Sequence, residues 1–447
     1  DLLPRPGTVV NVFIRQLTGI RFIAAAWVLL YHLQGPLNTL HLLAIPGLGD
    51  VARVGRLGVD LFFALSGFIL THTYLRRMGP SLRARGTLDF WWLRLARIYP
   101  VHLVMIVVAG VAVVAQARVT GEDLNRSWLN PFDFVKNIFL VQEWGPEPQR
   151  GWNFVAWSLS MEWLAYLIFP LLVLLLWVLY KRINAIGLAI LWVLTMIPLV
   201  MYGLSTSDAY YTNNWGSTYR IISEFIAGAI TYLIVCRLLP GSAMQEPASP
   251  RVERIASILA VVLPVLVVAG AVFLANLPAA QPPQVTVDAD AEPLPPYFHL
   301  LLVPLLIAWI GALALSRRGL ARFLSTRALV LGGFISYSLY MTHLVWFGLW
   351  RAAMRAAGID GGVLYALGFI ALVGGALVIA WLMWKFVEEP AREWMRGRVG
   401  VRRTPTEEAG EAIAEQAPDP DAADPVDVET APTDPFVAQE KDPDATS

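Results

Sequence analysis

An arginine and a histidine occur at helical spacing inside one long apolar segment near the start of the chain. Residues 16–34 read QLTGIRFIAAAWVLLYHLQ and include Arg21 and His32. The two positions are eleven residues apart, about three turns of an α-helix, so both side chains share one face and lie roughly 16 Å apart along its axis. Ionisable groups are costly inside a bilayer, and the pair therefore predicts a functional site. The alternative is that Arg21 reaches the headgroups on one side of the membrane and His32 those on the other.

A second arginine pair lies in the segment FWWLRLARIYP. Arg94 and Arg97 are three positions apart there, so they share a helix face. Guanidinium groups can bind phosphate oxygens in a bidentate manner. The segment continues into an apolar helix, which places the pair at a depth similar to that of Arg21. Three arginines at one depth predict a pocket for a polyanion; the alternative is that the pair only anchors its helix at the cytoplasmic surface.

Three carboxylates interrupt other apolar segments. Asp60 occurs in GRLGVDLFFALSGFIL, Glu162 in FVAWSLSMEWLAYLIFP and Glu224 in RIISEFIAG. Ser158, Glu162 and Tyr166 are four residues apart in turn, which predicts a polar stripe along an otherwise apolar helix. A carboxylate at such depth must be protonated, paired or in contact with water. These side chains therefore either belong to a site or pair with arginines to hold the helices together.

A late apolar segment, FISYSLYMTHLVWF, carries a second histidine. Ser336, Tyr340 and His343 follow i, i+4, i+7 spacing and share a helix face. We expect His343 in the same half of the membrane as His32. A lone intramembrane histidine also serves as a hydrogen-bonding residue between helices, which is the alternative for His343. For Gly67, close helix packing through a small residue is the favoured interpretation.

The composition is that of an integral membrane protein, because 56% of the 447 residues are hydrophobic and only 15% are charged. The sole cysteine, Cys236, excludes an internal disulfide and a cysteine-rich metal site. The first apolar segment is long enough to stay in the membrane as an anchor rather than be cleaved as a signal peptide.

The expected fold is an all-α membrane protein with about ten spans, each with the roughly 17–25 apolar residues that a bilayer requires. They cover about residues 16–35, 58–76, 95–116, 154–180, 185–204, 220–238, 255–277, 298–315, 328–349 and 364–386. Arginine and lysine are concentrated in alternate loops, and this pattern predicts that both termini are cytoplasmic.

Two further segments are expected to lie outside the spans. Residues 130–144 are amphipathic and too short to cross the membrane, which predicts an interfacial or re-entrant helix on the outer side. Loop 278–297, rich in proline and alanine, is expected to be flexible.

The end of the chain differs in charge from the rest. The segment from Glu407 to Asp444 holds thirteen acidic residues and one basic residue, which leaves a net charge of +12 for the remainder of a chain that is neutral as a whole. This composition predicts two regions, a membrane domain of residues 1–403 and a disordered acidic cytoplasmic tail of residues 404–447.

Five stretches together resemble the acyltransferase 3 family of multi-pass bacterial membrane proteins, which includes O-acetyltransferases of lipopolysaccharide and peptidoglycan and antibiotic acyltransferases. They are the arginine–histidine spacing of Arg21 and His32, GVDLFFALSGF, RLARIYP, WSLSMEW and SYSLYMTHL. The stretches occur in the family's order, and the resemblance covers about residues 15–390. It implies acyl transfer to a hydroxyl beyond the membrane, from an acyl-coenzyme A with acetyl as the expected group.

In that interpretation Arg21, Arg94 and Arg97 bind the phosphates of cytoplasmic acyl-coenzyme A, which is a co-substrate and not a permanently bound cofactor. No metal is implied. The resemblance suggests an envelope glycan or glycolipid as the acceptor, at the bacterial inner membrane. The expected partners are these two substrates and the lipid bilayer, with no nucleic acid.

His32 is expected to act as the general base on the acceptor hydroxyl, because imidazole titrates near neutral pH. Glu162 or Asp60 would orient its ring and stabilise the imidazolium. A transient acyl-histidine is the alternative mechanism. The residues expected to bind the acceptor or to support the site are His343, Tyr340, Ser336, Glu224 and Ser158.

Two other classes of function remain open from the sequence. A transporter or flippase could line its passage with the same buried charges. The sequence shows no internal repeat, which weakens that alternative because many transporters are built from repeats. A membrane scaffold is the third class, in which no buried polar residue would be needed individually.

Overall fold

The computed structural model describes residues 13–121, 129–144, 151–204, 215–240, 247–277 and 298–399. These residues form helices and connecting turns, and none of them lies in a β-strand. The expected flexible loop 278–297 and the acidic tail 404–447 lie outside the described residues. The all-α class predicted from the sequence is confirmed.

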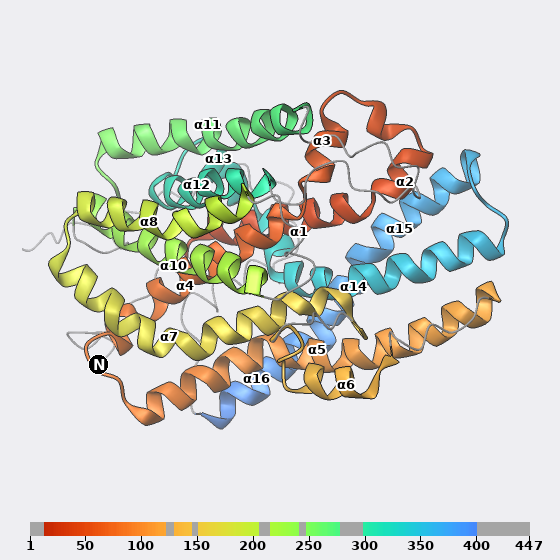
Figure 1. The fold of residues 1–447 in the computed structure, drawn as a ribbon, viewed down its shortest axis with the longest axis horizontal. Helices are drawn as coiled ribbons and strands as arrows, with labels where there is room; N and C mark the ends of the chain where they lie inside the picture. The colour runs from red at the N-terminus through yellow and green to blue at the C-terminus, as the bar shows by residue number, and fades with distance from the viewer. Residues whose placement is uncertain are drawn as a thin grey trace, which may run out of the picture.

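The long helices run mainly along the longest axis of the molecule (Figure 1). The first half of the chain forms α1 (Arg15–His32), α2 (Gln34–Thr39), α3 (Leu48–Arg53), α4 (Leu57–Met78), α5 (Ala84–Thr120), α6 (Pro131–Ile138), α7 (Trp157–Arg182) and α8 (Ala185–Gly203). The second half forms α10 (Trp215–Leu238), α11 (Pro250–Ala275), α12 (Val303–Leu315), α13 (Leu320–Leu324), α14 (Arg327–Ala356), α15 (Gly362–Met383) and α16 (Glu389–Arg398).

Within the described residues, nine helices are long and apolar enough to cross a membrane. They correspond to nine of the ten spans predicted from the sequence. The tenth, α1, forms as an 18-residue helix packed against α4 and α14, but it is not in this set. Arg15, Arg21 and His32 lower the mean hydropathy of α1, and seven of its eighteen residues are buried against the rest of the bundle.

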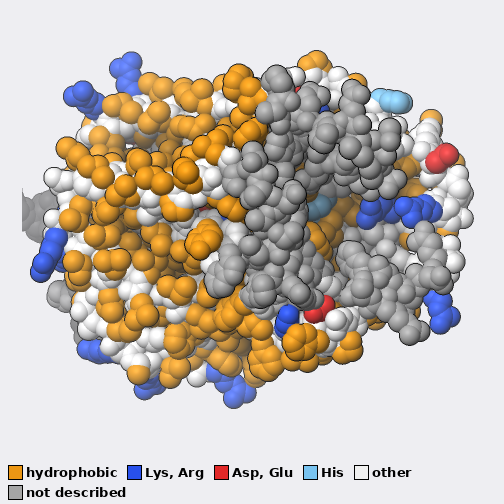
Figure 2. Space-filling model, in the orientation of Figure 1, with side chains coloured by type: hydrophobic (Ala, Val, Ile, Leu, Met, Phe, Trp, Pro, Cys, Tyr) orange, Lys and Arg blue, Asp and Glu red, His pale blue; other side chains and the backbone are white. Residues whose placement is uncertain are grey.

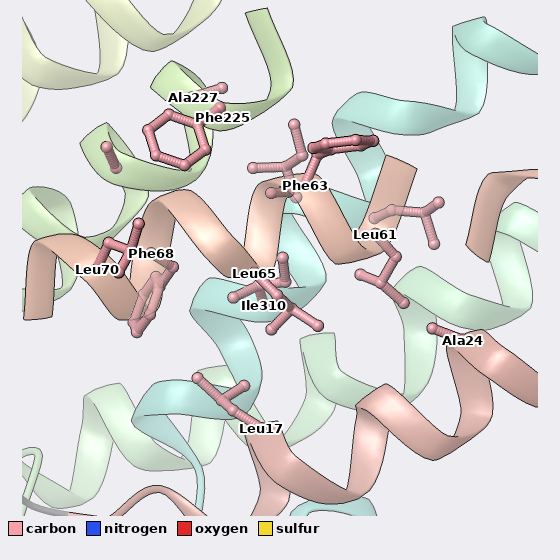
Figure 3. Close-up of a cluster of buried hydrophobic side chains, with 14 of the residues drawn as sticks. Leu17, Ala24, Leu61, Phe63, Leu65, Phe68, Leu70, Phe225, Ala227 and Ile310 are labelled. Atoms are coloured by element: carbon pink, nitrogen blue, oxygen red, sulfur yellow. The ribbon is translucent and has the colours of Figure 1, made fainter. Parts of the chain in front are cut away.

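Helix α4 lies at the centre of the apolar core (Figure 3). Its Leu61, Leu65 and Phe68 are almost fully buried among residues of α1, α10 and α12. A Cβ atom at Gly67 would lie 1.9 Å from the carbonyl oxygen of Phe225 in α10. The backbones of α4 and α10 therefore touch at this glycine, as the close-packing interpretation predicted.

The short helix α6 has an inverted distribution of side chains. Its apolar Phe132 and Val135 are exposed, whereas the polar Asp133 and Asn137 are buried against the bundle. With eight residues it is too short to span, as expected. An exposed apolar face of this kind suits contact with lipid. The described surface in Figure 2 is also mostly hydrophobic, with basic side chains mainly near its edges.

Two helices extend beyond the spans predicted for them. Helix α5 is 37 residues long and begins at Ala84, so Arg94 and Arg97 lie inside it and not at its entry. Helix α15 continues through the π-helical segment Trp384–Glu388 into α16. A π-helical turn rotates the side chains that follow, and this one directs Glu388 into the bundle, where it is 1% exposed.

Candidate active site

A buried cavity of about 140 Å³ lies among α1, α4, α5, α7 and α14. Arg21 lines it from α1, Arg94 and Arg97 from α5, Glu162 from α7 and Tyr340 from α14. The remaining wall is mostly apolar and comes largely from α4. Arginines from two separate segments therefore line one cavity, as the sequence predicted from their similar depth in the membrane. The lining presents three guanidinium groups and a single carboxylate, which favours an anionic ligand.

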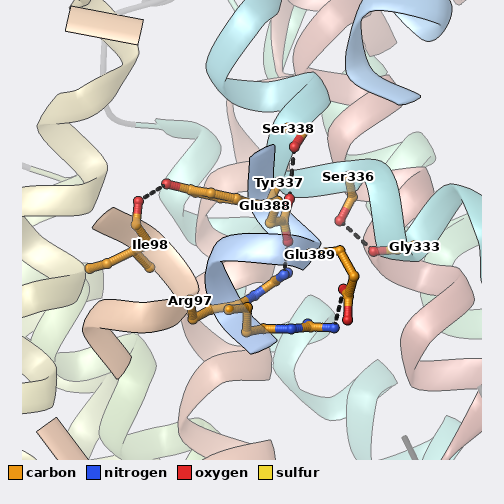
Figure 4. Close-up of polar contacts among 9 residues, drawn as sticks. Arg97, Ile98, Gly333, Ser336, Tyr337, Ser338, Glu388 and Glu389 are labelled. Carbon is orange, nitrogen blue, oxygen red and sulfur yellow. Dashed lines mark hydrogen bonds and ion pairs between the residues drawn. The ribbon is translucent and has the colours of Figure 1, made fainter. Parts of the chain in front are cut away.

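Arg97 is held in place by a carboxylate that the sequence analysis missed (Figure 4). Its guanidinium forms an ion pair with Glu388 of the π-helical segment. The hydroxyl of Ser338 in α14 donates to the other oxygen of Glu388 at 2.7 Å. The ring of Tyr337 lies 5.4 Å from the Arg97 guanidinium, and its hydroxyl donates to the carbonyl of Ile98. Three helical segments, α5, α14 and the π-helical segment, thus fix the position of one arginine.

Arg94 and Arg21 are held differently. The Arg94 guanidinium lies over the rings of Tyr74, Phe90 and Tyr166, at 5.7 to 5.9 Å from their centroids. Arg21 lines the cavity but forms no hydrogen bond or ion pair with any residue that the structure describes. A cation that faces a cavity without such a partner is suited to bind an anion.

Glu162 is the acidic side chain of the cavity, and its hydrogen-bond partner is Tyr166, one helical turn further along α7. The contact agrees with the polar stripe predicted for this helix. The expectation that Glu162 orients His32 stays a prediction, because the hydrogen bond that the structure shows for this carboxylate comes from Tyr166. Glu162 also lies in the electrostatic field of Arg97, Arg21 and Arg94.

His32 contacts a second histidine. Its Nδ1 lies 3.1 Å from Nε2 of His343 in α14 and 2.9 Å from the carbonyl oxygen of Val28. Nδ1 of His343 lies 2.7 Å from the carbonyl oxygen of Tyr340. A carbonyl oxygen can only accept, so both Nδ1 atoms must carry protons. If both rings are neutral, the Nδ1–H group of His32 donates to Nε2 of His343 as well as to the Val28 carbonyl. The lone pair of His32 is then on its Nε2.

Tyr340 connects this histidine pair with the cavity. Tyr340 lines the cavity, and its hydroxyl accepts a hydrogen bond from Ser158 at 2.9 Å and donates to the carbonyl of Val155 at 3.1 Å. Its ring centroid lies 5.8 Å from that of His343, one helical turn away. His32 and His343 are therefore outside the cavity lining but adjacent to the end marked by Ser158 and Tyr340.

Asp60 and Glu224 belong to a different cluster. Asp60 accepts two hydrogen bonds of 2.5 Å from Arg220 of α10, and Glu224 lies 3.5 Å from the same guanidinium. All three side chains are buried, at 4% exposure or less. The expectation that Asp60 orients His32 is therefore wrong, because its carboxylate is committed to Arg220 and links α4 to α10.

Ser336 also departs from the expected arrangement. Its hydroxyl donates to the carbonyl oxygen of Gly333 in its own helix at 2.7 Å, and it does not line the cavity (Figure 4). Of the face predicted on α14, Tyr340 reaches the cavity and His343 reaches His32. Sequence reasoning left out Arg220, although it precedes Glu224 by one helical turn and is therefore a natural partner.

The fold and this site define a multi-pass membrane protein with a cationic cavity buried between its helices. The family model described as "Acyltransferase domain" (Acyl_transf_3) matches residues 14–385. The chain belongs to the acyltransferase 3 family, as the five sequence stretches indicated.

Several curated proteins are similar in sequence. The acyltransferase MdmB of Streptomyces mycarofaciens is 34% identical over 180 residues, which are 40% of this chain and 42% of that protein. The peptidoglycan O-acetyltransferase OatA of Listeria monocytogenes is 29% identical, over 44% of this chain and 31% of OatA. The putative O-acetyltransferase SACOL0978 of Staphylococcus aureus is 24% identical, over 85% of this chain and 58% of that protein.

The chain spans less than two thirds of the length of each of these relatives, between 31% and 58%. No solved structure matches the chain.

Proposed function

We propose that the protein is a membrane O-acyltransferase that moves an acyl group, acetyl in the simplest case, from cytoplasmic acyl-coenzyme A to a hydroxyl of an envelope glycan or glycolipid. The observation that carries the proposal is the cavity lined by Arg21, Arg94 and Arg97. Coenzyme A is a phosphate-rich anion, and guanidinium groups in a low-dielectric cavity are its natural ligands. The names of the relatives, an acyltransferase and O-acetyltransferases, support the same reaction class.

The three arginines would divide the work of donor binding. Arg97 and Arg94 are already positioned by Glu388 and by aromatic rings, so they offer a preorganised surface to the phosphates. Arg21, without an ion pair among the described residues, would gain the most from an anion. The acyl end would extend along the cavity toward Tyr340, beyond which the two histidines lie.

In the chemical step Nε2 of His32 would remove the proton of the acceptor hydroxyl as its oxygen attacks the thioester carbonyl carbon. The carbon–sulfur bond breaks, the new carbon–oxygen bond forms, and the imidazolium returns the proton to the departing thiolate of coenzyme A. His343 would take the role expected of a carboxylate, because it fixes the His32 tautomer by accepting from Nδ1. In this proposal α1 supplies two functional residues, Arg21 to bind the donor and His32 to transfer the proton.

The acceptor side is proposed from the relatives and from the basic-loop pattern. One relative is named a peptidoglycan O-acetyltransferase, which makes an envelope glycan the first acceptor to test. Positive charge in alternate loops places the Arg21 end of α1 toward the cytoplasm and the His32 end toward the outer face. The host is then a bacterial inner membrane, with the donor on one side and the acceptor on the other.

Mass spectrometry of envelope glycans and lipids tests the reaction in cells. A deletion strain should lose an acyl group from one component, the wild-type gene should restore it, and His32→Ala should not, because losing a general base slows a reaction about 10²- to 10⁴-fold. Restoration by His32→Ala at wild-type level would remove His32 from the mechanism.

The transporter alternative makes a different prediction for the same variant. Passage of a substrate through the bundle needs no proton transfer to a thioester, so His32→Ala would leave uptake or flipping intact. Acyl-coenzyme A consumption by the purified protein, lost in His32→Ala, supports the enzyme. If the wild-type protein consumes no acyl-coenzyme A and transport does not depend on His32, the transporter is favoured.

A further inference from the structure

A second cavity, of about 320 Å³, lies where the start of α1 meets the end of α12 and the short helix α13. Three arginines line it, Arg15 from α1, Arg317 from the turn after α12 and Arg322 from α13. Apolar side chains form most of the remaining lining, among them Phe13 and Leu315. This cavity shares no lining residue with the candidate active site.

The three arginines are available for a ligand. Each is exposed, and among the residues that the structure describes none of them forms an ion pair with a carboxylate. The neighbouring Arg318 differs, because its guanidinium lies 3.5 Å from the carboxylate of Glu253 in α11. Two adjacent arginines therefore have separate roles, Arg318 in an ion pair that joins this turn to α11 and Arg317 in the cavity wall.

The floor of the cavity is fixed by hydrogen bonds. The amide nitrogen of Gln16 donates to the carbonyls of Leu313 at 3.0 Å and Ser316 at 3.2 Å, which are acceptors at the end of α12. The hydroxyl of Ser325 donates to Ala321 of α13 at 2.8 Å. The two Gln16 bonds hold α1 and α12 together, and the Ser325 bond closes the end of α13. The three guanidinium groups form no ion pair among the described residues and can therefore bind a ligand.

We propose that this cavity is a binding site for a phosphate group, with the phosphate of an anionic phospholipid as the ligand that fits its two-sided character best. Guanidinium groups bind phosphate oxygens bidentately, and the apolar wall would cover a glycerol and the start of an acyl chain. The basic-loop pattern places this end of the bundle at the inner leaflet, where anionic lipids attract arginine. The phosphate could also come from a soluble anion, and the experiment separates the two sources.

The test compares two variants of the purified full chain. Arg317→Gln/Arg322→Gln removes two of the three cavity cations. Arg318→Gln removes an arginine that is adjacent in sequence but does not line the cavity, and it serves as the control. Native mass spectrometry of protein in mixed micelles, titrated with phosphatidylglycerol or with phosphatidylcholine, gives the fraction of lipid-bound protein. Inorganic pyrophosphate is titrated separately as the soluble probe.

Each lost arginine should weaken phosphate binding about tenfold, as a charge-assisted hydrogen bond does. We expect the double variant to lose phosphatidylglycerol binding by roughly 100-fold, with Arg318→Gln unchanged and phosphatidylcholine bound weakly throughout. Loss of pyrophosphate binding instead would support a phosphate site with a soluble ligand. Equal affinities in all three proteins, or equal losses in both variants, would overturn the proposal. Because the readout is binding and not transfer, this result is independent of the proposed enzymatic function.

Discussion

The direction of one hydrogen bond, between His32 and His343, decides which nitrogen of His32 can act as a base. The backbone carbonyls of Val28 and Tyr340 favour a proton on each Nδ1 atom, so in a neutral His32 the lone pair is on Nε2. A neutral imidazole in the place of a carboxylate leaves the pair uncharged in its resting state. Inside a bundle of apolar helices, an uncharged pair avoids much of the cost of a buried ion.

His343 is expected to act through His32 as a positioning residue. His343→Ala should lower kcat about 10- to 100-fold with little change in the KM for the donor, by analogy with residues that orient a ligating histidine. His343→Gln retains an acceptor near the position of Nε2 and should recover part of the loss, which a packing defect would not. The double variant with His32→Ala should be no slower than His32→Ala alone, because residues that act as a unit are non-additive. Additive losses would separate the two histidines.

Asp60 is expected to be structural. Asp60→Ala leaves the guanidinium of Arg220 buried without the carboxylate that accepts two of its hydrogen bonds, and Glu224 lies farther away at 3.5 Å. Loss of a buried partner costs about 3 kcal/mol or more, so the variant should unfold at a clearly lower temperature in detergent. Asp60→Ala/Arg220→Met removes both charges and should recover part of that stability. Wild-type stability of Asp60→Ala, with transfer abolished, would instead return Asp60 to the active site.

The sequence indicated the charged residues of the cavity but few of their partners. Arg21, Arg94 and Arg97 could be found because charges inside apolar segments are conspicuous. Glu388 could not, because an acid beside Glu389 and Pro390 at the end of a span is typical of an interface. Its contact with Arg97 joins residues 291 positions apart and depends on the π-helical turn. The His32–His343 contact could not be predicted either, because it joins residues 311 positions apart.

At the scale of helices, apolar length predicted the spans well, since a bilayer requires a minimum number of apolar residues. The ends of the helices were predicted less well, because tertiary contacts outside the apolar core extend them. Trp92 shows this for α5, since its indole nitrogen donates to the carbonyl of Met395 in α16 at 2.7 Å. Helices α5 and α16 thus support each other beyond the predicted span.

Gly67→Ala is expected to separate α4 from α10. The added Cβ would lie 1.9 Å from the Phe225 carbonyl oxygen, a backbone atom that cannot move away cheaply. Overpacking of this kind costs about 1–3 kcal/mol, which should lower the unfolding temperature and the yield of folded protein. Gly374→Ala in α15 is the matched control, because its Cβ would meet nothing within 4 Å. Equal stability of the two variants would show that the α4–α10 contact tolerates expansion.

At the scale of the whole molecule, the connection between α7 and α8 and that between α14 and α15 lie at opposite ends of the long axis (Figure 1). The basic-loop pattern predicts that the first is cytoplasmic and that the second is outside. In a Cys236→Ser background, cysteine at Asp360 should be labelled by a membrane-impermeant reagent in intact cells, and cysteine at Arg182 only after lysis. Both positions are exposed. Labelling at Arg182 in intact cells, with Asp360 labelled only after lysis, would show that the donor and acceptor sides are assigned the wrong way round.

The measurement that tests the central claim most directly is equilibrium binding of acetyl-coenzyme A to the purified protein. Arg21→Gln and Arg97→Gln each remove one guanidinium from the cavity, and Arg77→Gln, an exposed residue of α4 outside the cavity, is the control. A lost charge-assisted contact costs roughly 1.5–3 kcal/mol, so each cavity variant should bind about ten- to a hundredfold more weakly while Arg77→Gln binds as the wild type does. Folded cavity variants that bind acetyl-coenzyme A with wild-type affinity would contradict the assignment of this cavity to the donor.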